Sequence, residues 1–371
     1  MKIALIGTRG IPAKYGGFET CAEALSSRLV QKGHEVCVYG RSGYYKEKPK
    51  EYLGVRLVYL TEINIKFFET LCHTFFSLIH SIWKKYDILF VFNSANSPLL
   101  IIPRLLRKNL VLHVDGLEWK RGKWGFLGRK YHKFAEWIAA KLSINLISDS
   151  GEIQRYYRTK YKKDTRFISY GADIQFSRNR SILDQFGLEP RQYFLQITRF
   201  EPENNPLLSI RAFELIKTDK KLVVVGGVKY QTKYSEEIHA TKDKRIKFLG
   251  FIYDKDILRE LLCNCFTYIH GNEVGGTNPA LLEAMGSGCF VICRDVPFNR
   301  EILQNTGIYF AKDVDDLKEK LIWSLENRDS IERMGEQSRE IIRKKYNWNF
   351  ILEKYERLFE EILRRDDKGQ I

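Results

Sequence analysis

The sequence predicts an α/β protein made of two doubly wound, Rossmann-like domains that face a cleft. Short β-rich apolar runs alternate with helical periods along the chain, which is typical of parallel sheets covered by helices. This alternation is interrupted by one polar stretch and then starts again. The 371 residues, of which 44% are hydrophobic, are sufficient for two domain cores.

The first domain is predicted to extend from residue 1 to residue 170. Its expected strands are the apolar runs at 3–6, 36–39, 88–92, 110–112 and 145–147. The second domain is predicted at residues 191–346, with expected strands at 193–197, 222–225, 246–249, 266–269 and 290–293. Residues 171–190 carry no apolar period and are predicted to be the linker.

The last helical segment, residues 347–371, has its apolar side chains on one face and its charges on the other. The apolar positions are Ile351, Leu352, Tyr355, Leu358, Phe359 and Ile362. We expect this helix to pack back on the first domain. Because doubly wound sheets bind ligands beyond the carboxyl ends of their strands, a two-substrate site is expected in the cleft between the domains.

The net charge of +15 favours an anionic partner, such as a nucleotide diphosphate, a lipid headgroup or a nucleic acid. The seven cysteines lack the paired spacing and neighbouring histidines of a zinc site, so we expect reduced core residues. The amino terminus begins directly with an apolar strand and resembles no signal peptide. Since no apolar run is long enough to span a bilayer, a cytoplasmic protein is predicted.

A long glycine-rich loop, GTRGIPAKYGGFE at residues 7–19, follows the first expected strand. Its glycines allow backbone N–H groups to approach an anion at a helix start, and we predict donor binding at Gly16 and Gly17. The loop fits neither the dinucleotide fingerprint nor the P-loop, which argues against a dehydrogenase and an ATPase. A purely structural turn is the alternative, although the loop is long for a strand–helix connection.

The second informative motif is HGNEVGGTNPALLEAM, residues 270–285, which follows an expected strand and opens a helix. Gly275, Gly276 and Thr277 would present backbone donors at the positive helix end, where a diphosphate is stabilised. Glu283 is embedded among apolar residues of this helix, so its carboxylate needs a partner. Ribose hydroxyls of a bound nucleotide are the predicted partner.

This motif resembles the signature of the family 4 glycosyltransferases, which have the GT-B fold. In that family the donor-binding helix is associated with two glutamates. Glu283 matches the second glutamate, whereas Gly275 occupies the position of the first. Glu273 is the candidate that takes over the catalytic role of the missing side chain.

The resemblance extends to TRFEPENN at residues 198–205, where the family uses an arginine and a lysine to neutralise the departing diphosphate. Arg199 matches the arginine and is predicted to be catalytic as well as donor-binding. Asn204, a predicted donor contact, stands where the family has the lysine. We expect Arg9 or Lys14 of the facing domain, both also predicted on the acceptor side, to supply the missing cation.

Other motifs widen the resemblance. FLGFI at residues 248–252 resembles the family's base-binding turn, in which backbone groups around Phe251 and Ile252 read the nucleobase, and Gly226 lies in the loop before it. Together with GTRGIPAKYGGFET and VDGLEWKRGKWG, these motifs resemble a subgroup that contains bacterial rhamnosyltransferases. This resemblance implies L-rhamnose, from dTDP-rhamnose, as the donor sugar.

Polar side chains also follow the fourth expected strand of the first domain. His113 and Asp115 are predicted to orient the acceptor hydroxyl, although Asp115 fits a helix-capping role equally well. The predicted acceptor-binding residues of this segment are Glu118, Trp119 and Lys120. No metal is expected, because Asp115 is not part of a DxD triplet and Arg199 with helix amino termini can replace a cation.

Residues 119–133 interleave basic with aromatic side chains, a composition that suits an anionic membrane surface. The basic residues include Lys120, Arg121, Lys123, Arg129 and Lys130. A solvated basic face is the alternative interpretation. The stretch at residues 67–83 is apolar nearly all round, which predicts a buried or interdomain helix rather than a membrane anchor.

We therefore predict a retaining glycosyltransferase that moves a sugar onto a lipid-linked or polysaccharide acceptor in cell-surface glycan synthesis, at the inner face of the membrane. One alternative is a nucleotide-sugar 2-epimerase of the same fold, which needs several acids and bases in the cleft. Another is a nucleic-acid-binding protein, which the charge alone suggests. Since no nucleic-acid-binding motif accompanies that charge, no nucleic-acid partner is expected.

Overall fold

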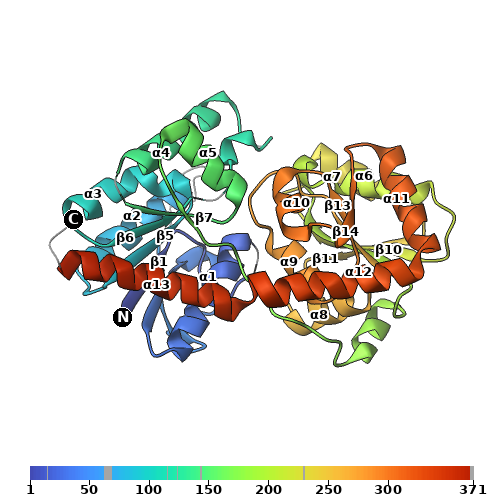
Figure 1. The fold of residues 1–371 in the computed structure, drawn as a ribbon, viewed down its shortest axis with the longest axis horizontal. Coiled ribbons are helices and arrows are strands. Elements are labelled where there is room, and N and C mark those ends of the chain that lie inside the picture. The colour runs from blue at the N-terminus through green and yellow to red at the C-terminus, as the bar shows by residue number, and fades with distance from the viewer. Residues whose placement is uncertain are drawn as a thin grey trace. The chain divides into compact units, whose positions relative to one another are not determined.

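The computed structural model describes residues 1–14, 16–61, 69–114, 116–122, 124–142, 144–228 and 230–367. It divides into two compact units, the first formed by Met1–Tyr170 with Trp348–Ile371 and the second by Gly171–Asn347. Each unit contains one mainly parallel sheet with helices on both faces (Figure 1). The predicted α/β, doubly wound fold class is confirmed.

The sheet of the first unit has the strand order β3-β4-β2-β1-β5-β6-β7-β8. All neighbouring strands pair in parallel except β3 and β4, which are antiparallel. The strands are β1 (Lys2–Ile6), β2 (Glu35–Arg41), β3 (Glu51–Tyr52), β4 (Val55–Leu60), β5 (Ile88–Phe92), β6 (Leu110–His113), β7 (Asn145–Ser148) and β8 (Arg166–Phe167). The central strands are buried almost completely, as continuous apolar runs require in a sheet covered on both faces.

The helices of the first unit cover both faces of its sheet. Right-handed crossovers place α2, α3, α4 and α5 on one face, because each of these connections leads toward the β8 edge. The α1 connection leads the other way and lies on the opposite face, where α13 packs beside it (Figure 1). The helices are α1 (Gly17–Gln31), α2 (Glu69–Ile82), α3 (Ile101–Leu105), α4 (Phe126–Lys141), α5 (Gly151–Tyr161) and α13 (Trp348–Asp367), with short helical turns η1 (Ser42–Tyr44), η2 (Ser94–Leu100) and η3 (Glu118–Lys120).

Helix α13 returns to the first unit at the end of the chain. All six apolar positions singled out in its sequence are buried. The ring centroids of Tyr355 and Phe359 lie 5.6 and 6.1 Å from that of Phe90 in β5. The apolar stripe of α13 thus packs on the core of this unit, as an amphipathic helix requires.

The sheet of the second unit has the parallel order β11-β10-β9-β12-β13-β14. Its strands are β9 (Tyr193–Arg199), β10 (Lys221–Gly227), β11 (Ile246–Gly250), β12 (Thr267–His270), β13 (Val291–Arg294) and β14 (Gly307–Phe310). Its helices are α6 (Pro206–Glu214), α7 (Lys233–His239), α8 (Lys255–Asn264), α9 (Pro279–Gly286), α10 (Pro297–Leu303), α11 (Val314–Glu326) and α12 (Arg328–Ile341), with turns η4 (Arg180–Phe186), η5 (Pro202–Asn204) and η6 (Ile342–Tyr346).

Residues 171–190, which the sequence marks as polar, are fastened to the second unit. The carboxylate of Glu260 in α8 accepts hydrogen bonds from Ser177 Oγ at 2.6 Å, Arg178 N at 2.7 Å and Asn179 N at 3.1 Å. These bonds fix the segment ahead of η4. Within the part of the chain that the structure describes, no helix is both long and apolar enough to cross a bilayer.

Candidate donor and acceptor sites

The motif at residues 270–285 forms the end of β12, a loop and the start of α9. Asn278 caps the helix, because its side-chain oxygen accepts a hydrogen bond from Ala280 N at 3.0 Å. Gly275 has a φ of +148° and open space where a side chain would begin, so a ligand can approach its backbone closely. Gly276 and Thr277 are buried between this opening and the helix start. The arrangement suits a phosphate group at the positive end of α9.

Glu283 lies in the second turn of α9 and is partly buried. Burial raises the pKa of its carboxyl from 4.5 to about 7, Lys255 lowers it, and Asp173 raises it further. A poorly solvated carboxylate gains from any hydroxyl that donates to it. The contact with ribose hydroxyls remains a prediction.

Arg199 is the last residue of β9, at the carboxyl edge of the second sheet. Its carbonyl oxygen accepts hydrogen bonds from Glu201 N at 2.8 Å and from Asn204 Nδ2 at 3.1 Å. Asn204 is almost fully buried and therefore shapes the loop that follows Arg199. A direct contact between Asn204 and the donor remains a prediction.

The lack of a side chain at Gly226 allows the backbones of β9 and β10 to lie close together at their carboxyl ends. Its φ is +126°, and a Cβ at this position would lie 1.8 Å from the carbonyl oxygen of Thr198. Any other residue would push the two strand ends apart. Gly226 therefore contributes to the placement of the neighbouring Arg199, independently of any contact with a ligand.

The expected base-binding elements adjoin each other. The rings of Phe251 and Tyr253 are stacked, with 6.1 Å between centroids and an interplanar angle of 3°. A Cβ on Gly227 would lie 3.3 Å from the Phe251 ring, so the loop after β10 contacts the turn after β11. Both rings are exposed, whereas Ile252, which lies between them in the sequence, is partly buried. Nucleobase recognition by this turn remains a prediction.

A buried polar cluster lies under the loop between β12 and α9, and the sequence analysis missed it. Both amide atoms of Gln196, Asn204 Oδ1 and His270 Nε2 have no hydrogen-bond partner among the described residues. A Cβ on Gly271 would lie 2.2 Å from Asn204 O and 3.1 Å from Gln196 Nε2, which shows that these residues adjoin. Burial lowers the pKa of His270 to about 3, so its ring is neutral. The polar Gln196 inside the apolar run YFLQI was the available signal.

Glu273 is held by two cations that no local motif indicated. Its Oε2 lies 3.4 Å from Arg294 Nε, and its Oε1 contacts Lys312 Nζ. Its backbone N–H donates to Glu203 O at 3.0 Å. Because both carboxylate oxygens take part in ion pairs, Glu273 holds the loop in place, and its catalytic role remains a prediction.

The glycine-rich loop of the first unit is fastened by carboxylates of its own helix. Glu19 Oε1 accepts a hydrogen bond from Arg9 N at 3.0 Å, and Glu23 Oε2 accepts one from Ala13 N at 2.5 Å. A Cβ on Gly16 would lie 2.0 Å from Glu19 Oε2, so this carboxylate sits at the start of α1. The Arg9 guanidinium pairs with this carboxylate, with its Nη1 3.9 Å from Glu19 Oε1. Donor binding at Gly16 and Gly17 remains a prediction.

The cationic side chains of this loop gather beside Tyr44. The Arg9 guanidinium carbon lies 5.8 Å and Lys14 Nζ 5.6 Å from the centroid of the Tyr44 ring. Both side chains reach solvent, since Arg9 is partly and Lys14 largely exposed. They can therefore meet an anionic group, and their acceptor-binding role remains a prediction.

Removal of the Glu19 carboxylate is expected to loosen this loop. Glu19→Ala deletes a charge-assisted hydrogen bond to the backbone of Arg9 in a buried place, which costs about 1–3 kcal/mol of unfolding free energy. Glu35→Ala is the matched control, because Glu35 pairs with Lys2 on the surface and its loss should change little. Urea unfolding of both variants measures the difference, and equal midpoints would contradict the assigned role of Glu19.

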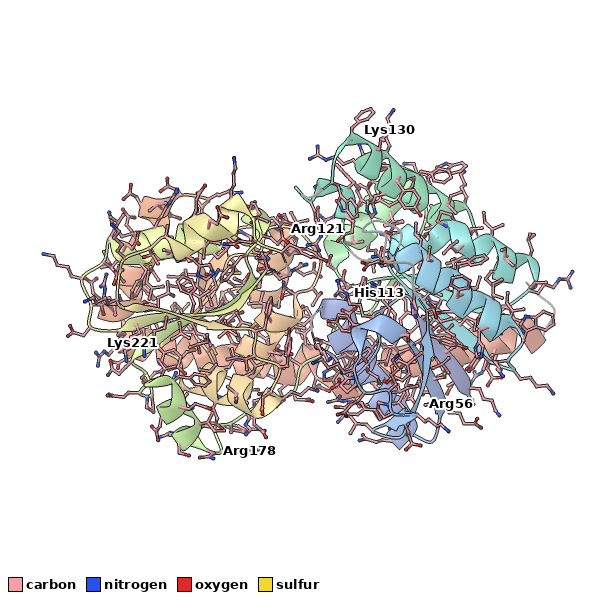
Figure 2. The ribbon with its side chains drawn as sticks, turned by 180° about the vertical axis from the view of Figure 1, so that it is seen from behind. Arg56, His113, Arg121, Lys130, Arg178 and Lys221 are labelled. Atoms are coloured by element: carbon pink, nitrogen blue, oxygen red, sulfur yellow. The ribbon has the colours of Figure 1, made fainter. Side chains whose placement is uncertain are left out.

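His113 lies at the end of β6 in the interior of the first unit (Figure 2). Its ring stacks between Phe92 and Tyr170, with centroid distances of 5.9 and 5.4 Å. Neither ring nitrogen has a hydrogen-bond partner among the described residues, and burial lowers the pKa to about 3. His113 is thus a neutral residue, and any role with an acceptor would be hydrogen bonding rather than acid catalysis. Asp115 lies outside the described residues.

The residues of η3 are mostly engaged within the first unit. Glu118 pairs with Arg121 and accepts a hydrogen bond from Trp124 Nε1 at 3.1 Å. Lys133 Nζ lies 4.5 Å from the centroid of the Trp119 ring. Lys120 is exposed and remains accessible to an acceptor. Among the residues that the structure describes, no group of three or more His, Cys, Asp or Glu side chains is placed to hold a metal ion.

Two family models match this chain. A model described as glycosyl transferases group 1 matches residues 180–341, and one described as a domain of unknown function, DUF1972, matches residues 100–173. The N-acetyl-alpha-D-glucosaminyl L-malate synthase of Bacillus anthracis is 25% identical over 244 residues, which are 63% of this chain and 62% of that protein. The O-antigen chain mannosyltransferase B of Escherichia coli is 25% identical over 153 residues, 39% of this chain and 40% of that protein. The chain thus covers less than two thirds of the length of either relative.

Solved structures resemble the chain over nearly its full length. Sucrose-phosphate synthase from Thermosynechococcus elongatus gives a TM-score of 0.85 at 19% identity, covering 98% of this chain and 99% of that one. HepE of Anabaena, solved in complex with UDP and glucose, gives a TM-score of 0.75 at 16% identity, covering 97% and 100%. At these identities the likeness concerns the fold.

Proposed function

We propose that the chain is a group 1 glycosyltransferase that transfers a sugar, with retention, from a nucleotide diphosphate donor to a cell-surface glycan. The family model of that description matches residues 180–341, and the solved structures that resemble the chain share its GT-B fold. The observation that carries the donor assignment is the open backbone at Gly275 ahead of the capped helix α9. Glu283 on the same helix adds an acceptor for ribose hydroxyls. The names of the two curated relatives, one a glucosaminyl malate synthase and one a mannosyltransferase, agree with sugar transfer.

The proposed reaction breaks the bond between the sugar C1 and the phosphate oxygen and forms a bond between C1 and the acceptor oxygen on the same face. The acceptor proton passes to an oxygen of the departing phosphate, so no carboxylate nucleophile is needed. Negative charge then grows on the diphosphate. Arg199 and the amino terminus of α9 are the groups that we expect to stabilise it.

We infer L-rhamnose, carried by dTDP, as the donor sugar. The inference depends on the resemblance of the combined motifs to rhamnosyltransferases, since neither relative is named for rhamnose. Because the donor sugar leaves from a diphosphate whichever nucleotide carries it, the proposed roles of Arg199 and α9 do not depend on this choice.

A panel of nucleotide sugars tests the donor. We expect the purified chain, mixed with lipid-linked glycan acceptors, to release nucleotide diphosphate from dTDP-rhamnose faster than from UDP-glucose, UDP-N-acetylglucosamine or GDP-mannose. Release is measured with a coupled assay, and the glycan product by mass spectrometry. Turnover of UDP-glucose alone would exclude rhamnose while leaving sugar transfer intact. Conversion of the donor without any acceptor would indicate an epimerase.

We also propose that the acceptor is linked to lipid and is met at the inner face of an anionic membrane. Of the basic residues predicted to face lipid, Lys120 is exposed in η3, and Arg129 and Lys130 are exposed on α4. Arg121 instead pairs with Glu118, and Lys123 lies outside the described residues. The charges of this segment therefore contribute less to a lipid contact than their number in the sequence suggests.

A further inference from the structure

Helix α2 buries mainly polar side chains, together with Leu78, and exposes several apolar ones. It buries His73, Thr74, Ser77 and Ser81 against the first unit. The same helix exposes Phe75, Phe76 and Ile79, and Trp83 just after it is 83% exposed. Sequence periodicity predicts a buried helix here, and this prediction is wrong for these four side chains. A helix at a water-facing surface normally has the opposite arrangement.

Helix α4 shows the same inversion. It buries His132 and Glu136, and the Glu136 carboxylate accepts hydrogen bonds from Tyr156 Oη at 2.8 Å and Tyr161 Oη at 3.0 Å. Its exposed side carries Phe126, Leu127, Phe134 and Trp137. Leu127, Phe134 and Trp137 recur at helical spacing, so they form one stripe. Exposure of these apolar side chains to water is unfavourable, and a contiguous exposed apolar stripe indicates that a partner covers it.

The exposed sides of α2, α3 and α4 belong to one surface. Both α2 and α4 pack against η2, which continues directly into α3. Arg104 Nε of α3 donates to Leu142 O at the end of α4 at 3.3 Å, and Tyr131 Oη of α4 donates to Ala95 O in η2 at 2.7 Å. Figure 1 shows the three helices next to one another on the same side of the sheet. On α3, Leu105 is 78% exposed.

The charges of α3, α4 and the segment between them are mostly positive. Residues 101–141 contain ten Lys or Arg and three Asp or Glu. Of the three acids, Glu118 pairs with Arg121, Glu136 is buried under its tyrosines, and Asp115 lies outside the described residues. Lys130 lies at the outer surface (Figure 2), with its Nζ 4.3 Å from the centroid of the exposed Phe126 ring. Cationic and apolar groups therefore meet within the same surface.

We propose that the exposed sides of α2, α3 and α4, here called the outer face, dock the first unit onto an anionic lipid membrane. Aromatic and leucine side chains enter the boundary between headgroups and acyl chains, and lysines and arginines contact the lipid phosphates. The inference builds on the proposed use of a lipid-linked acceptor. It extends the membrane contact to the exposed apolar side chains of α2 and α3, whereas the sequence predicted contact only through the basic and aromatic residues of 119–133.

A protein that inserts apolar side chains into the membrane interface responds to salt differently from one that is held by charge alone. Charge attraction between basic residues and anionic lipid is screened, but burial of apolar side chains is not. We therefore expect high salt to weaken vesicle binding of the intact chain without abolishing it. Neutral vesicles should bind the chain weakly through the apolar side chains alone.

Co-sedimentation with vesicles tests the outer face, using the full chain and no sugar donor. Phosphatidylglycerol–phosphatidylcholine vesicles are compared with phosphatidylcholine alone. Arg129→Gln with Lys130→Gln should lower partitioning to anionic vesicles by about 30-fold, since each basic residue near the surface is worth roughly 1 kcal/mol. Leu105→Ser with Leu127→Ser should lower it by about 10-fold or more and remove the component that resists salt.

Matched substitutions on the second unit serve as controls. Lys242→Gln with Lys244→Gln removes two exposed charges, and Leu215→Ser removes an exposed leucine. These controls should bind vesicles like the intact chain. Equal binding by all variants would overturn the proposal. So would sedimentation velocity showing a dimer that Leu105→Ser with Leu127→Ser dissociates, because the outer face would then bind a second copy.

Donor turnover separates this proposal from the proposed function. The outer-face variants should retain their turnover with a water-soluble glycan acceptor, because none of the changed residues belongs to the donor site. Vesicle binding without any sugar transfer would uphold the outer face and reject the enzyme assignment. Sugar transfer without vesicle binding would uphold the enzyme assignment and reject the outer face as a membrane-docking surface.

Discussion

Replacing Arg199 with alanine is expected to lower turnover by about 10²-fold or more, while the protein stays folded. The reason is that Arg199 is the last residue of β9, at the carboxyl edge of the second sheet, where the departing diphosphate is proposed to lie. Charge on the diphosphate grows as the sugar bond breaks, so the arginine contact strengthens in the transition state. The effect should therefore appear mainly in kcat rather than in donor affinity.

The second unit offers a matched control for Arg199. Arg211 on α6 is an exposed arginine whose Nη2 lies 3.7 Å from Glu237 Oε2, and Arg211→Ala should leave turnover unchanged. Steady-state kinetics with saturating donor, together with isothermal titration of the nucleotide diphosphate, separates kcat from binding. Full activity in a folded Arg199→Ala protein would remove Arg199 from the site.

Much of the fold could be predicted because buried parallel strands appear as uninterrupted apolar runs. Each expected run overlaps an observed strand, from β1 to β13. Four observed strands have no expected counterpart: β4, β14 and the two-residue strands β3 and β8. In β4 the sequence VRLVYL contains Arg56, and its register beside β2 leaves part of the strand exposed, so the run is broken. The four residues of β14 are too few for a periodic signal.

The site was harder to predict than the fold, because its supports come from distant positions. Lys312 and Arg294 hold Glu273, yet they belong to strands and loops outside the motif. Periodicity identified α2 as apolar, but it could not say which side faces inward, since that depends on the helices packed beside it. Burial of polar residues such as His73 requires partners in the tertiary structure, which here include Gly40 O at 3.0 Å.

Replacing Glu283 with glutamine is expected to weaken donor binding and to remove its dependence on pH. The raised pKa of about 7 means that wild-type Glu283 is largely protonated at pH 5–6 and ionised at pH 8. Ribose hydroxyls donate best to the ionised carboxylate, so wild-type affinity should rise with pH, by at most about 10-fold per unit below pH 7. Glutamine has no charge to lose, and its weaker affinity should stay flat.

The Glu283 carboxyl should also make the stability of the donor-free protein fall as pH rises, opposite to the trend in donor affinity. Because the folded pKa lies above the ordinary value of 4.5, the folded state binds more protons, and stability falls as pH rises from about 4.5 to about 7. Glu283→Gln lacks this loss, which is about 3 kcal/mol for the full shift. At about 2–4 °C per kcal/mol, its melting temperature should exceed that of the wild type by roughly 10 °C at pH 8 and match it near pH 4.5. Calorimetry of both proteins across this range, alongside donor titrations, tests the pair of trends. If affinity is independent of pH in the wild type while stability behaves as expected, Glu283 is a buried acid of α9 that does not contact the donor.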